Sequence, residues 1–69
     1  MVEIFKTNVE RTEDTNFLLQ TLTLVFPCYK INFDLSDCDK ILRIEGENIK
    51  LDKIIEILNR NNYVCINLD

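Results

Sequence analysis

The stretch Met1-Val-Glu-Ile-Phe-Lys-Thr-Asn-Val-Glu-Arg-Thr-Glu-Asp14 decides how the rest of the chain is arranged. Phe5, Thr7 and Val9 alternate with polar residues, which predicts a half-buried strand over residues 2–9. Val2 and Ile4 have the opposite parity, so the strand begins apolar on both sides. That pattern fits either an inner strand or a strand with a partner surface.

A charged and polar loop follows this strand, over residues 10–14, and leads into a helix. Thr12 or Asp14 can cap that helix by accepting hydrogen bonds from its first free amides, so we expect it to begin near Thr15. Apolar residues recur at three- and four-residue spacing, which indicates one buried face. They are Phe17, Leu18, Leu19, Leu22, Val25 and Phe26, and we place Thr15, Gln20 and Thr23 on the outer side. The breadth of the stripe also fits a surface for a partner helix, although core packing explains it more simply.

Pro27 ends the helix, because proline cannot continue the helical hydrogen bonding. Tyr29, Ile31, Phe33 and Leu35 then alternate with polar residues as a strand with one buried face. Residues 36–39 are typical of a turn. Residues 40–45 predict a strand that pairs antiparallel with the strand before the turn. The spacing of apolar residues predicts a second helix over 51–61, with Asn62 in left-handed conformation at its end, and a last strand over 63–68.

The order of these elements is strand, helix, strand, strand, helix, strand. Such an order folds as two right-handed split units that share one four-stranded antiparallel sheet, with both helices on one face. We therefore predict an α+β, ferredoxin-like sandwich that forms a single domain over residues 1–69. The chain has only one glycine and one proline, which leaves little room for a flexible linker.

Composition limits the classes of partner and location. The chain carries 8 basic and 12 acidic residues, for a net charge of −4, which disfavours a nucleic-acid partner because binding to phosphate relies on cationic side chains. No apolar run approaches the ~20 residues needed to span a bilayer, and the N-terminus lacks the order of a signal peptide. We expect no membrane association and a cytoplasmic location. Cys28, Cys38 and Cys65 are too few for the disulfide framework of a small secreted domain, so we expect reduced thiols.

Several short strings in this chain resemble the heavy-metal-associated domain, the fold of copper chaperones and metal-ATPase modules. They are Phe5-Lys-Thr-Asn-Val9, Asp39-Lys-Ile-Leu-Arg-Ile44 and Ile54-Ile-Glu-Ile-Leu58 followed by Asn62-Tyr63, so the resemblance covers nearly the whole chain. In that family the loop after the first strand carries a Cys-x-x-Cys pair that binds soft metal ions. The resemblance places the two positions of that pair at Arg11 and Asp14, and both thiols are absent.

Soft-metal sites need sulfur or imidazole ligands that converge, and this chain has no histidine. In the usual strand order 4-1-3-2, the strands near Cys28 and Cys65 are opposite edges of the sheet, so the thiols are not expected to meet. The carboxylates of Glu10, Glu13 and Asp14 suit a hard cation, but clustered acids in a loop are more simply explained by solvation. We therefore predict that this chain binds no metal ion and no cofactor.

Catalysis is not expected, because the sequence has no nucleophile paired with a base and no phosphate-binding glycine loop. The carboxylates of Asp37 and Asp39 fall in a turn, where hydrogen bonding to the backbone accounts for them. We predict a non-enzymatic interaction module that contacts a protein partner, or forms a homodimer, through a sheet edge, the open sheet face or the loop Glu10, Arg11, Thr12, Glu13, Asp14. The alternative is a protein that handles copper or zinc through an unusual cysteine site. A small-molecule regulatory domain is a third option, for which the sequence offers no ligand motif.

Overall fold

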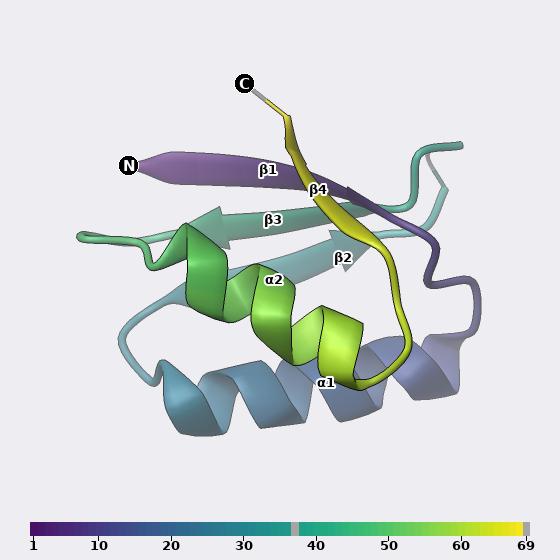
Figure 1. The fold of residues 1–69 in the computed structure, drawn as a ribbon, viewed down its shortest axis with the longest axis horizontal. Helices are drawn as coiled ribbons and strands as arrows, with labels where there is room; N and C mark the ends of the chain where they lie inside the picture. The colour runs from purple at the N-terminus through teal and green to yellow at the C-terminus, as the bar shows by residue number, and fades with distance from the viewer. Residues whose placement is uncertain (37, 69) are drawn as a thin grey trace.

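A computed structural model of the chain describes residues 1–36 and 38–68. The elements follow the predicted order: β1 (Val2–Thr7), α1 (Thr12–Val25), β2 (Lys30–Asp34), β3 (Ile41–Glu45), α2 (Leu51–Arg60) and β4 (Cys65–Leu68). The four strands form one antiparallel sheet in the order β2-β3-β1-β4 (Figure 1). The fold is therefore the α+β, ferredoxin-like arrangement expected from the sequence.

The register of the strands sorts their side chains onto two faces. Phe33, Leu42, Phe5 and Asn67 are aligned across β2, β3, β1 and β4, and they point toward the helices. The neighbouring row across the same strands points the other way, to the face that carries no helix. We call this second side the open face; its central row is Asn32, Arg43, Ile4 and Leu68.

The core lies between the sheet and the two helices. Its buried members come from every element except β2, together with the loop after β1, and β2 adds the half-buried Ile31 and Phe33. The cluster is Phe5, Val9, Leu18, Leu22, Leu42, Ile44, Ile54, Leu58 and Cys65. The alternation predicted for the first two strands thus directs Phe5, Ile31 and Phe33 toward the core.

Helix α1 begins earlier than the sequence analysis predicted. It starts at Thr12 rather than near Thr15, and its N-cap is Arg11, which makes no side-chain capping bond. The prediction that Thr12 or Asp14 caps the helix is wrong, since both residues lie inside the first turn. Acidic side chains such as Glu13 and Asp14 are favourable there, because the N-terminal end of a helix carries partial positive charge.

The buried face of α1 is also narrower than predicted. Thr15, expected on the outer side, is buried, and its hydroxyl is satisfied by donating to the Thr12 carbonyl oxygen at 2.7 Å. Phe17 and Val25, expected in the core stripe, are each 54% exposed. Leu18 and Leu22 are the leucines of α1 that are fully buried.

The turns follow the expected chemistry where they are described. The carboxylate of Asp34 accepts hydrogen bonds from the amide and the hydroxyl of Ser36 at the start of the β2–β3 turn. Asp37, which the sequence analysis paired with Asp39, lies outside the described residues. Asn62 after α2 adopts φ 69°, the left-handed conformation predicted for that position. In the described part of the chain, no helix has the length and apolar character needed to cross a membrane.

Candidate functional site

The connection between β1 and α1 holds the positions that the family resemblance singles out, and buried residues fix its path. Thr7 donates its hydroxyl to the Lys40 carbonyl oxygen at 2.6 Å, and its amide donates to the Asp39 carbonyl oxygen at 3.1 Å. The same Thr7 oxygen accepts from the amide of Val9 at 3.3 Å, and the Val9 side chain is fully buried. The connection is therefore held against residues 39–40, which lead into β3.

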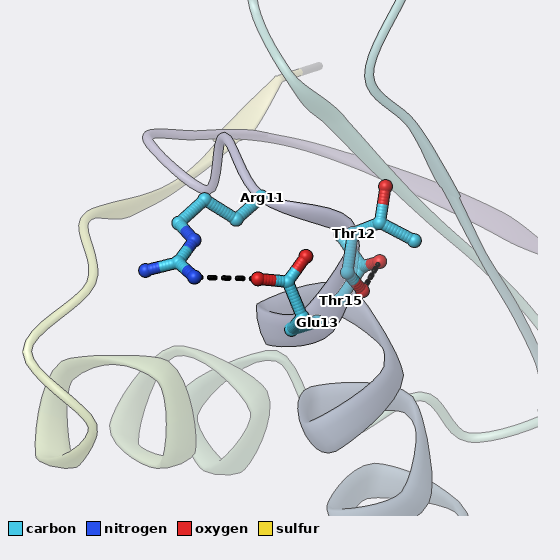
Figure 2. Close-up of polar contacts among 4 residues, drawn as sticks. All are labelled: Arg11, Thr12, Glu13 and Thr15. Atoms are coloured by element: carbon cyan, nitrogen blue, oxygen red, sulfur yellow. Dashed lines mark hydrogen bonds and ion pairs between the residues drawn. The ribbon is translucent and has the colours of Figure 1, made fainter.

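The five residues predicted as an interaction loop divide between the loop and the helix. Glu10 is exposed ahead of the helix and Arg11 caps it, whereas Thr12, Glu13 and Asp14 form its first turn. The Arg11 guanidinium donates to the Glu13 carboxylate in an exposed ion pair (Figure 2). Such a pair contributes only about 0.2–1 kcal/mol. Its main effect here is to turn the arginine back onto its own helix.

Asp14 is engaged from another direction. Its carboxylate acts on the hydroxyl of Tyr63, which lies between α2 and β4. Partial burial and then the Asp14 carboxylate raise the pKa of Tyr63 above its ordinary value, while Arg11 acts in the opposite direction. Sequence reasoning missed this contact, because no local pattern links two residues that are 49 positions apart.

The two positions that carry cysteines in the resembling family are thus occupied by a guanidinium and a carboxylate, each with a partner in this chain. Neither group is a soft ligand. Within residues 1–36 and 38–68, no group of three or more histidine, cysteine, aspartate and glutamate side chains is placed to hold a metal ion.

The three cysteines lie apart and none forms a disulfide within the described chain. Cys28 precedes β2 and Cys38 follows it, so the two exposed thiols lie at opposite ends of that strand. Cys65 opens β4 at the other edge of the sheet and faces the core. Burial raises the pKa of the Cys65 thiol to about 12, which keeps it protonated at neutral pH and makes it a poor metal ligand.

A different surface stands out on the open face of the sheet. Near its β4 edge lie exposed large apolar side chains, between 38% and 52% accessible. These are Val2, Val64, Ile66 and Leu68, and we call them the β4 patch. Beside them the half-buried Ile4 lies directly opposite Leu68. The sequence carried a signal for this patch, since Val64, Ile66 and Leu68 lie on one side of their strand and Val2 and Ile4 lie on one side of theirs.

Apart from the terminal Met1, the other exposed large hydrophobic side chains in the described part of the chain lie on α1. Phe17, Leu24 and Val25 are 54%, 80% and 54% exposed. They explain why the apolar stripe of α1 looked broad in the sequence. The two sets belong to different layers of the molecule, since one lies on the open sheet face and the other on a helix.

Comparison of the chain with models of known protein families, with curated proteins and with solved structures returns no match in any of the three.

Proposed function

We propose that this chain is a small, non-enzymatic protein-interaction module, related to heavy-metal-associated domains and lacking their metal site. The observation that carries the proposal is the β4 patch. Its side chains are apolar and exposed although the chain has a full core on the opposite face of the sheet. Contiguous exposed apolar surface of this kind marks protein-contact sites in soluble proteins.

The position of the patch supports the same proposal. It lies beside β4, an edge strand whose outer backbone groups have no strand partner in the described residues. An exposed edge of this kind accepts a further strand through main-chain hydrogen bonds, and flanking apolar side chains add burial. We place the module in the cytoplasm, which the absence of disulfides among its three cysteines favours.

The experiment that tests the proposal places a photo-crosslinking amino acid at Ile66, in the β4 patch, in cells that make this protein. Asn32 is the matched control, because it is exposed on the same open face but lies on the opposite edge strand. The proposal expects covalent adducts from position 66 and few from position 32. Equal adducts from both positions, or none from position 66, would overturn it.

The alternative, copper or zinc handling through cysteine, is tested separately by titrating the reduced protein with Cu(I) and Zn(II) while following amide chemical shifts. We expect no tight binding, since Cys28 and Cys38 are separated by the length of β2 and Cys65 is buried. Saturable shifts confined to residues next to a cysteine would support the alternative. A Cys28→Ser, Cys38→Ser variant identifies whether the exposed thiols are responsible.

A further inference from the structure

The two edges of the sheet differ in how well they are protected from pairing. Edge strands usually carry charged residues or proline, which prevent association with another strand. The β2 edge follows this rule, with Pro27 just before the strand and Lys30 and Asp34 on its open face. The segment 63–68, which contains β4, has no charged residue and no proline. Its edge is therefore open to a further strand.

The directions of the backbone groups show which residues of β4 are available. The amide of Thr7 donates to Asp39 on the β3 side, so Thr7 does not bond to Cys65, its neighbour across β1 and β4. The amide of Val64 donates to the side chain of Asn8 at 2.8 Å, toward β1. Because successive residues of a strand direct their backbone groups to opposite sides, Cys65 and Asn67 direct theirs away from the sheet.

We propose that the β4 edge binds a second copy of this chain, forming an antiparallel pair of β4 strands about a two-fold axis at Ile66. The inference rests on the proposed function and names its partner. In this register Cys65 faces Asn67 of the second copy, and these are the residues whose backbone groups point away from the sheet. Each of the two symmetric pairs exchanges two backbone hydrogen bonds.

The same register matches the side chains of the open face. Val64 lies opposite Leu68 of the second copy, and the Ile66 residues of the two copies lie opposite each other. Every exposed apolar residue of this segment therefore contacts another apolar residue. If the register shifted by one residue, outward-pointing backbone groups of one strand would face residues whose backbone groups point inward, and the hydrogen bonds between the strands would be lost. A shift by two toward the start of the strand would set Leu68 against Asn62. The strand is thus self-complementary in the register centred on Ile66, which favours a second copy over an unrelated chain.

Helix α2 fits this arrangement. It packs on β4 and runs roughly opposite to it (Figure 1). The two-fold axis at Ile66 therefore sets the α2 helices of the two copies antiparallel to one another.

The dimer is expected to be modest in strength. β4 has only four residues, so the contact is at the small end of specific interfaces, below about 1,200 Å² in total. The two copies also repel one another through their net charges of −4. Salt screens that repulsion and leaves the apolar contact intact, so dimerisation should strengthen between low and moderate ionic strength.

Sedimentation equilibrium of the reduced protein tests the inference. We expect reversible dimers over a micromolar to millimolar concentration series. Ile66→Lys sets two like charges against each other at the axis and should abolish the dimers. The matched Asn32→Lys on the β2 edge should leave dimerisation unchanged. A wild-type monomer at the highest concentration, or equal effects of the two variants, would overturn the inference. Adducts from position 66 to another protein would then still support the proposed function.

A disulfide test checks the register directly. In a Cys28→Ser, Cys38→Ser background, Ile66→Cys places two thiols opposite each other at the axis, where the separation of strand neighbours suits a disulfide. Oxidised glutathione takes up the two electrons, yielding one protein disulfide and two reduced glutathione molecules. Leu68→Cys is the control, since its two copies would lie roughly 13 Å apart, four strand positions from one another. Faster covalent dimerisation of the Leu68→Cys variant would contradict the register, and faster dimerisation of the Ile66→Cys variant would support it.

Discussion

Raising the pH above 9 should destabilise this protein through one buried thiol. Cys65 is 6% exposed and faces the core, and burial raises the pKa of its thiol from 9.0 to about 12. In the unfolded chain the same thiol ionises near pH 9, so above that pH the unfolded state binds fewer protons than the folded state. The free energy of unfolding therefore falls as pH rises from 9 toward 12, and is unaffected by this group below pH 9.

The size of the effect follows from the two pKa values. At pH 10 the loss of stability from Cys65 is on the order of 1 kcal/mol, and across the full window it approaches roughly 4 kcal/mol. Urea unfolding at pH 8 and pH 10 measures it in the presence of a reductant. The quantity to compare is the pH-dependent change in the free energy of unfolding of the wild type minus that of Cys65→Ala, which isolates the contribution of this thiol.

The control for this experiment is Cys38→Ala, which removes an exposed thiol and should retain the wild-type dependence on pH. Cys65→Ala should be less stable than the wild type at pH 8, because it loses buried volume, yet it should lose less stability between pH 8 and pH 10. Identical losses in Cys65→Ala and the wild type would refute the reasoning, since they would show that the buried thiol does not govern the response.

Two further predictions concern packing, and both are measured by chemical denaturation. Leu22→Ala should cost about 2–5 kcal/mol because it opens a cavity in the core, whereas Leu24→Ala, on the exposed side of the same helix, should change stability by less than about 0.5 kcal/mol. Similar losses would contradict the assignment of the buried face of α1. Gly46→Ala should cost about 1–3 kcal/mol, because its added methyl group would lie 2.7 Å from the Tyr29 ring, and that ring is held by a hydrogen bond to Asn48. An unchanged Gly46→Ala protein would show that the ring moves freely.

Much of the fold was predictable because local pattern and tertiary burial agree. The alternation of Ile31 and Phe33 with polar residues, and the buried Ile54 and Leu58 one turn apart in α2, are patterns with one simple interpretation. Pro27 likewise fixed the end of α1, which stops at Val25. These signals give the order of the elements, and the order gives the topology.

The errors arose where local sequence is ambiguous. Charged residues at Glu13 and Asp14 suit both a loop and the first turn of a helix, so the start of α1 was placed three residues late. Thr15 was expected to be exposed because it is polar, but a hydrogen bond to a backbone carbonyl makes its burial inexpensive. The link between Asp14 and Tyr63 depends on tertiary structure alone.

The candidate surface was only partly visible in the sequence. The parity of Val64, Ile66 and Leu68 showed that β4 is apolar on one side, but not that this side faces away from the helices. That assignment needed the pairing of Ile66 with Lys6 and of Leu68 with Ile4 in the sheet. The loop at Glu10 to Asp14 was the stronger candidate from sequence, and in the structure its charged side chains at Arg11 and Asp14 are engaged within the chain.

The most direct test of the central claim is amide hydrogen exchange of residues in β4, measured at low and at high protein concentration. If β4 pairs with a second copy, the outward amides of Cys65 and Asn67 exchange rapidly in dilute protein and become protected as the concentration rises. The amide of Ile66, which points toward β1, is protected at both concentrations. Rapid exchange of Cys65 and Asn67 at every concentration would contradict the claim that this edge is the contact surface between copies.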